Sequence, residues 1–175
     1  MTTLEQPVSD TEIFRQTRVF DAPEELMWKV WTDPEHLVKW WGPAGMQVIL
    51  KEVDIRVGGR LLYGMQGPMG IMWGRFVYRL LSEPNLLAYV VSFTNEQGDP
   101  VRHPMVANWP LEVLAVQTFD ESNGKTTMES RSYPINATPE ERAVFTAGHA
   151  GMQMGFAGTF AQLEAYLAKL KEQQP

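Results

Sequence analysis

Residues 138 to about 171 have the pattern of one long amphipathic helix, which constrains the fold more than any other feature. Thr138, Pro139 and Glu141 combine an N-cap, a first-turn proline and the acidic partner of a capping box. Helical spacing then places apolar side chains on one face: Phe145, Met152, Phe156, Leu163, Leu167 and Leu170. A helix of this length has to bury that face against something large and apolar.

The segment from residue 46 to residue 133 predicts a series of short strands, which are the only candidate for that surface. Turn residues such as Gly58-Gly59 and Asn123-Gly124 separate the segments. Expected strands cover residues 12–20, 47–57, 60–66, 71–81, 86–95, 111–119 and 125–133. Because short turns connect antiparallel neighbours, we expect an α+β fold with a curved antiparallel sheet of six to seven strands wrapped around the C-terminal helix.

Residues 18–43 predict two short helices after the first strand. Pro23 is expected as the first residue of one helix, and Asp33-Pro34 provides an N-cap and a first residue for the other. Gly42-Pro43 should end the second helix. The segment holds four tryptophans: Trp28, Trp31, Trp40 and Trp41. This aromatic surface either closes a core or forms the wall of a cavity.

Length and composition favour a single domain in the cytoplasm. The 175 residues predict a folded core over residues 12–171, preceded by a flexible tail over residues 1–11. Without cysteine there is no disulfide or thiolate metal site, and no apolar run reaches the roughly 20 residues of a membrane span. A net charge of −6 without a basic cluster argues against binding to nucleic acid. We expect neither a metal nor a cofactor.

Five short motifs resemble the family named for activators of the heat-shock-protein-90 ATPase. They begin at Val19 (Val-Phe-Asp-Ala-Pro), Trp31 (Trp-Thr-Asp-Pro-Glu-His-Leu), Trp40 (Trp-Trp-Gly-Pro), Val53 (Val-Asp-Ile-Arg-Val-Gly-Gly-Arg) and Phe156 (Phe-Ala-Gly-Thr-Phe-Ala-Gln-Leu). The resemblance extends from about residue 14 to residue 170. It implies the helix-grip fold of the START/SRPBCC superfamily, which the birch allergens share.

The resemblance implies three different functions. Members of the superfamily bind lipids, hormones or polyketides between helix and sheet, some cyclise polyketides, and the eukaryotic namesakes contact a chaperone. We therefore expect a protein that binds a small hydrophobic or aromatic ligand, with a chaperone-interacting module and a polyketide cyclase-like enzyme as alternatives. A homodimer is compatible with each. The family often has tryptophan at the position of Phe156, so the phenylalanine implies extra room there.

Gly148, Gly151, Gly155 and Gly158 lie beside the apolar face of the long helix. Four glycines inside a helix should cost about 3–4 kcal/mol relative to alanine, so some compensating role is expected. Close approach of a strand or a second subunit is the first explanation. Space for a ligand over the helix is the second.

The candidate ligand-binding side chains are aromatic residues, histidines and a methionine expected near the helix–sheet cavity: Trp40, Trp41, Phe76, Tyr78, Tyr89, His103, Trp109, His149, Met152 and Phe156. His149 is the candidate acid or base, or else a core histidine. The proline-rich insertion over residues 96–110 is either a lid or a loop whose Trp109 packs on the double tryptophan. No motif for a hydrolytic triad, a phosphate loop or paired catalytic carboxylates is present.

Overall fold

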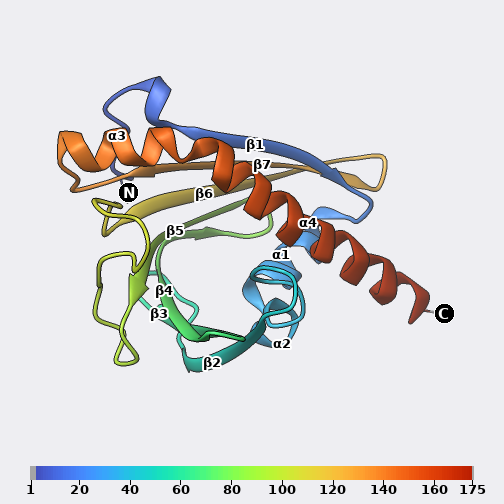
Figure 1. The fold of residues 1–175 in the computed structure, drawn as a ribbon. Helices are drawn as coiled ribbons and strands as arrows, with labels where there is room; N and C mark the ends of the chain where they lie inside the picture. The colour runs from blue at the N-terminus through green and yellow to red at the C-terminus, as the bar shows by residue number, and fades with distance from the viewer. Residues whose placement is uncertain (1–2, 175) are drawn as a thin grey trace.

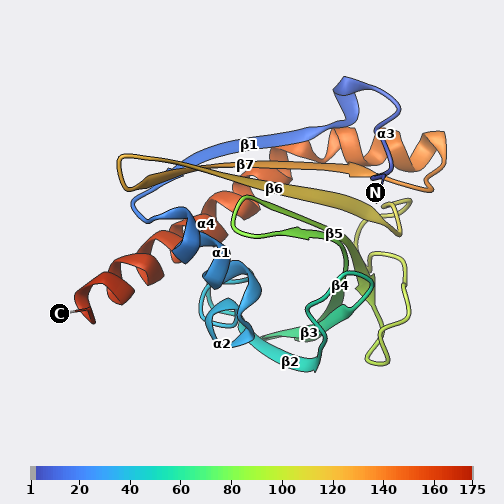
Figure 2. The same ribbon diagram turned by 180° about the vertical axis from the view of Figure 1, so that it is seen from behind.

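In the computed structural model, which describes residues 3–174, seven strands form one antiparallel sheet. The strands are β1 (Phe14–Phe20), β2 (Gln47–Val53), β3 (Arg60–Gly67), β4 (Gly70–Ser82), β5 (Leu86–Thr94), β6 (Val113–Ser122) and β7 (Lys125–Pro134). Their order across the sheet is β1-β7-β6-β5-β4-β3-β2, so β1 and β2 are the two edges. Figures 1 and 2 show β1, β7 and β6 side by side at one end, and β4, β3 and β2 curling below them.

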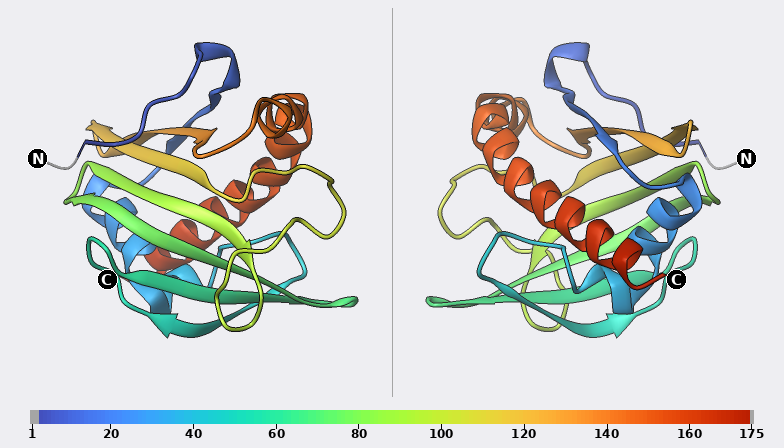
Figure 3. Two further views of the ribbon diagram at one scale, coloured as in Figure 1. Left: turned by 90° about the vertical axis from the view of Figure 1, so that its left-hand side faces the viewer. Right: turned by 90° about the vertical axis from the view of Figure 1, so that its right-hand side faces the viewer.

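The helices lie on the concave side of this curved sheet. They are α1 (Glu24–Thr32), α2 (Pro34–Leu37), α3 (Pro139–Ala147) and α4 (His149–Glu172), while the short 3-10 helix η1 (Asp10–Glu12) precedes the edge strand β1. Figure 3 shows α4 crossing the opening of the sheet, with α1 and α2 at its lower end. The expected α+β helix-grip fold, with two short helices after the first strand, is confirmed.

Several predicted boundaries are wrong by a few residues. Pro23 is the N-cap of α1 instead of its first residue, and α2 ends at Leu37 before a run of turns. The strand β2 ends at Val53, because the chain reverses over residues 54–59. A Cβ on Gly59 would lie 2.2 Å from the carbonyl oxygen of Asp54, so only glycine fits this reversal.

The predicted single C-terminal helix is two helices that meet at Gly148. The predicted capping box is present, because the Thr138 side chain accepts from the N–H of Glu141 and the Glu141 carboxylate accepts from the N–H of Thr138. At Gly148 the backbone has φ −82° and ψ −5°, and its N–H bonds to the carbonyls of both Val144 and Phe145. The helix resumes at His149, so the expected length is kept with a break inside it.

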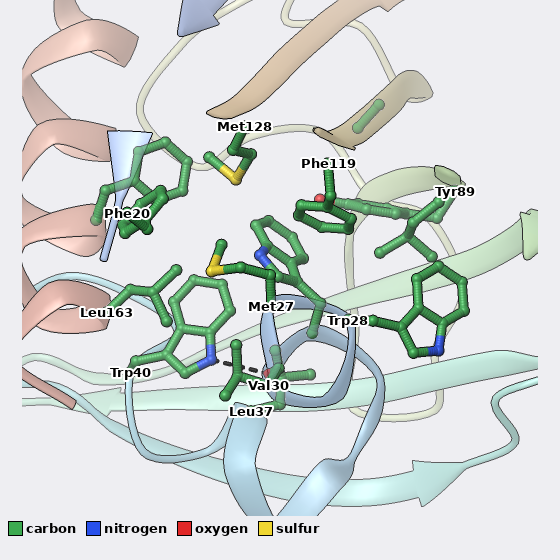
Figure 4. Close-up of a cluster of buried hydrophobic side chains, with 14 of the residues drawn as sticks. Phe20, Met27, Trp28, Val30, Leu37, Trp40, Tyr89, Phe119, Met128 and Leu163 are labelled. Atoms are coloured by element: carbon green, nitrogen blue, oxygen red, sulfur yellow. Dashed lines mark hydrogen bonds between the residues drawn. The ribbon is translucent and has the colours of Figure 1, made fainter. Parts of the chain in front are cut away.

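The main core fills the end of the concave face near α1 and α2. Trp31 and Trp40 are 2% and 1% exposed, their ring centroids are 4.8 Å apart, and the indole N–H of Trp40 donates to the carbonyl of Val30 at 3.0 Å. Figure 4 shows how Met27 of α1 and Leu163 of α4 point into this cluster. Here the tryptophans close a core.

A second core lies on the other face of the sheet, around Leu114 and Tyr133. Leu4 packs against it, and the Tyr133 hydroxyl donates to the backbone carbonyl of Glu5 at 2.9 Å. These contacts involve the segment expected to be a flexible tail, of which residues 1 and 2 lie outside the described part of the chain, as does residue 175. The flexibility of residues 1–11 stays a prediction.

Candidate functional site

A cavity of about 590 Å³ lies between the concave face of the sheet and the α3–α4 junction. Small-molecule sites occupy about 300–1,000 Å³, so the volume suits a compact organic ligand. Aromatic side chains make up much of its wall: Trp41, Tyr63, Tyr89, Phe93, Trp109, Phe145 and Phe156.

The sheet wall follows from the two-residue period of strands. Tyr89, Val91 and Phe93, which alternate along one face of β5, line the cavity together with their neighbour Ser92. Antiparallel pairing places Ala115 of β6 opposite Tyr89 and Ser132 of β7 opposite Ala115. The wall is therefore a set of cross-strand rows that run from β5 to β7.

On the helix side of the cavity, glycines leave space that side chains would otherwise fill. Both Gly151 and Gly155 line the cavity, and a Cβ built on either would have no heavy atom within 4 Å. Gly158 is equally open, although it lies outside the wall. Close approach of a strand, our first explanation for these three glycines, is therefore wrong among residues 3–174. Contact with a second subunit stays a prediction.

The loop between β5 and β6 closes one side of the cavity. The ring of Trp109 lies 5.3 Å from that of Phe145, and its edge would be 3.0 Å from a Cβ on Gly148. Trp109 thus packs at the helix break and not on the double tryptophan. Arg102 of the same loop donates to the Glu141 carboxylate. Whether this loop opens as a lid stays a prediction.

His103 organises the tip of that loop and lines the cavity. Its Nδ1 accepts from the backbone N–H groups of Met105 and Val106, at 3.0 and 3.1 Å. The ring proton must then reside on Nε2. Burial lowers the pKa of His103 below its ordinary value of 6.5, so the imidazole is neutral at pH 7.

The loop after the double tryptophan closes the opposite side. The carbonyl of Gly42 accepts from the Thr159 hydroxyl at 3.2 Å and from the Gln162 amide at 2.6 Å. Both donors come from α4, so this loop is fixed to the helix. Trp41, directly before it, is held with its ring against the cavity.

The sequence model of the family described as "Activator of Hsp90 ATPase homolog 1-like protein" matches residues 21–168 of this chain. The chain belongs to that family. Among solved structures, protein Ms6760 from Mycobacterium smegmatis is 28% identical, with a TM-score of 0.74 over 90% of this chain and 91% of its own. A protein from Arthrobacter aurescens is 26% identical, with a TM-score of 0.76 over 95% of this chain and 93% of its own. Among curated proteins, none matches this chain significantly.

In this member of the Hsp90-activator-like family, six of the ten candidate residues line the cavity. They are Trp41, Tyr89, His103, Trp109, Met152 and Phe156. Each of them lies on an inward position of β5, α4 or one of the two flanking loops. Their contact with a ligand stays a prediction.

The other four candidates lie outside the cavity wall. Trp40 packs in the main core, and Phe76 stacks behind Tyr89 with ring centroids 4.1 Å apart. Tyr78 is buried in the same core. The ring of His149 lies between those of two phenylalanines, Phe14 and Phe145, at centroid distances of 5.4 and 5.3 Å. These side chains therefore contribute to packing inside the protein and do not line the cavity.

Several polar residues of the cavity wall were not predicted from the sequence. Gln117, Ser130 and Ser132 face the cavity from β6 and β7, and the Gln117 amide donates to the Tyr89 hydroxyl at 3.4 Å. Their signal is a polar side chain at an inward strand position, which needs the strand register to be recognised. Burial raises the pKa of Tyr63 to about 12 and also raises that of Tyr89, so both hydroxyls stay protonated at pH 7.

Residues 3–174 contain neither a recognisable metal site nor a membrane-spanning helix. No cluster of three or more His, Asp or Glu side chains is arranged to hold a metal ion. In that same part of the chain, no helix is both long and apolar enough to cross a membrane.

Proposed function

We propose that this protein binds one small, mostly apolar and aromatic molecule in the cavity between the sheet and the α3–α4 junction. The observation that carries the proposal is the 590 Å³ space itself, bounded by Trp41, Tyr89, Trp109 and Phe156. Flat aromatic walls favour a ligand with rings of its own, because stacked and edge-on ring contacts add to the gain from burial. The proposed place of action is the cytoplasm, with which the absence of cysteine from the sequence is compatible.

The residues on the helix side of the cavity support a binding role. Gly151 and Gly155 destabilise the helix relative to alanine, and they leave open space beside it. The family resemblance implies a larger tryptophan at the position of Phe156, so the phenylalanine would leave additional room there. A chain selected for stability alone would gain by filling these positions, so the retained space supports a ligand.

The test is a fluorescence titration with N-phenyl-1-naphthylamine, a neutral aromatic probe. Gly155→Leu should fill the cavity and weaken binding of the probe by tenfold or more. Gly158→Leu is the matched control, because Gly158 lies one helical turn away, is equally open and is outside the wall. Equal binding by both variants and the original chain would place the probe elsewhere and overturn the proposal.

The chaperone-interacting module and the polyketide cyclase-like enzyme stay predictions drawn from the family. For the enzyme, His149 was the candidate acid or base, and its ring is packed between Phe14 and Phe145 outside the wall. Native mass spectrometry of the freshly purified protein, followed by release of bound molecules, would separate a small-molecule role, whether binding or enzymatic, from the chaperone-interacting role.

A further inference from the structure

One part of the cavity wall, on β6 and β7, groups three polar side chains. Gln117 and Ser130 are cross-strand partners in β6 and β7, and Ser132 lies two residues further along β7. The Tyr89 hydroxyl joins them from β5 through the Gln117 amide. Gln117 is 3% exposed and each serine 8%, so this polar floor, defined as Tyr89, Gln117, Ser130 and Ser132, lies deep in the molecule.

The polar floor has hydrogen-bonding capacity to spare. Among residues 3–174, the bond from Gln117 Nε2 to the Tyr89 hydroxyl is the one side-chain hydrogen bond within it. Gln117 Oε1 is buried without a partner. Since Tyr89 accepts from Gln117, its own proton is free to donate. Buried polar groups in folded proteins are nearly always paired, so these groups require either water or a ligand.

The cavity carries no formal charge at pH 7. No Asp, Glu, Lys or Arg of residues 3–174 belongs to its wall, and His103 is neutral because Nδ1 accepts two backbone N–H groups. An ionised ligand would lose its hydration without gaining a counter-charge, which is strongly unfavourable. A wholly apolar ligand would instead leave the polar floor unpaired.

We propose that the ligand is an uncharged aromatic compound that carries a hydroxyl or carbonyl group, and that this group lies against the polar floor. The inference rests on the proposed function and specifies its chemistry. The ligand oxygen accepts from one or two of the hydroxyls of Tyr89, Ser130 and Ser132, and Gln117 Oε1 accepts from the ligand where it carries a hydroxyl. The aromatic rings of the ligand occupy the apolar remainder of the cavity.

The test compares three probes with one ring system: 2-naphthol, naphthalene and 2-naphthoate. On the original chain, 2-naphthol should bind about tenfold more tightly than naphthalene, because it adds one or two buried hydrogen bonds. It should also bind at least tenfold more tightly than 2-naphthoate, which brings a charge. Isothermal titration calorimetry measures all three dissociation constants.

Variants of the polar floor test whether its side chains cause the preference for 2-naphthol. In the double variant Ser130→Ala/Ser132→Ala, and separately in Gln117→Leu, the advantage of 2-naphthol should shrink to less than threefold while naphthalene binds as before. Thr127→Ala is the control, because it removes a hydroxyl from an exposed position of the same strand. These substitutions only shorten or replace uncharged side chains, and circular dichroism checks that each variant folds.

The outcomes separate this inference from the proposed function. If 2-naphthol and naphthalene bind equally well, or if 2-naphthoate binds most tightly, the polar floor does not select a neutral polar ligand and the inference is wrong, while binding in the cavity stands. If neither neutral probe binds, nor N-phenyl-1-naphthylamine, the proposed function fails together with the inference.

Discussion

The two ends of the concave face use similar aromatic side chains to opposite effect. At one end Trp31 and Trp40 are almost completely buried and pack edge to face. At the other end Trp109 and Phe156 border a cavity of about 590 Å³. Aromatic content alone therefore does not distinguish a closed core from a binding site.

The difference lies in what stands opposite the rings. At the closed end, α1 and α2 supply Met27, Val30 and Leu37, which pack in one buried cluster with Trp31 and Trp40. At the open end the helix presents Gly151 and Gly155. Small residues on the facing helix leave the space unfilled.

Trp41 lies at the boundary between the two ends. Its ring is 5.6 Å from Trp40 on the core side and 6.4 Å from Phe156 on the cavity side. It also meets Phe76 edge to face at 5.2 Å. A ligand that contacts Trp41 would thus touch a ring whose position is fixed by the core.

The largest expected difference in stability is between the variants Trp31→Ala, at the closed end, and Trp109→Ala, at the open end. Trp31→Ala should cost about 3–5 kcal/mol of the free energy of unfolding, because it leaves a large hole in a close-packed core. Trp109→Ala should cost less than half as much, since its ring already borders empty space. Urea unfolding followed by circular dichroism measures both. Equal losses would mean that the two ends are packed alike.

A second comparison enlarges two side chains of α4 that lie one helical turn apart. Phe160→Trp should lower the free energy of unfolding by about 1–3 kcal/mol, because Phe160 is 2% exposed and packed against Phe20. Phe156→Trp should cost less than 1 kcal/mol, since the larger ring can extend into the cavity. The same variant should weaken binding of N-phenyl-1-naphthylamine several-fold, and Phe160→Trp should not. A large loss of stability from Phe156→Trp would mean that the cavity beside Phe156 has no room for the larger ring.

The fold could be predicted from the sequence because its signals are local. The capping box at Thr138, the glycine turn at Gly58-Gly59 and the family motifs each act within a few residues. The packing of Trp109 against Gly148 could not, because Trp109 is distant in sequence and reaches the glycine only in the folded chain. The polar floor was missed for the same reason: only strand register shows that Gln117 and Ser130 are partners.

A smaller contrast concerns the helix glycines. Gly158→Ala should raise the free energy of unfolding by about 0.5–1 kcal/mol, because the added methyl group meets nothing within 4 Å and alanine favours the helix. Gly148→Ala should gain less or lose stability, since its methyl group would press on Trp109 at 3.0 Å. Thermal unfolding of the two variants is a sufficient measurement. Equal stabilisation would show that Trp109 is not tightly held at the helix break.

The smallest expected effect is a pH dependence confined to the open end. Because burial lowers the pKa of His103, the folded protein favours the neutral ring more than the unfolded chain does. This contribution to stability is complete above the ordinary pKa of 6.5 and is lost as the pH falls below that value towards the folded pKa. Protonation of Nδ1 would also remove the acceptor used by the N–H groups of Met105 and Val106.

NMR titration of the ring protons should therefore give His103 a midpoint below 6.5, with the amide signals of Met105 and Val106 shifting in parallel. His103→Asn keeps a hydrogen-bond acceptor that does not titrate, so in this variant those amide shifts should disappear between pH 7 and pH 5 (roughly the range over which histidine charges). A midpoint above 6.5 would mean that the charged ring is the favoured one. The loop tip would then be held by something other than the neutral imidazole, and the cavity mouth would carry a positive charge that favours anionic ligands over neutral ones.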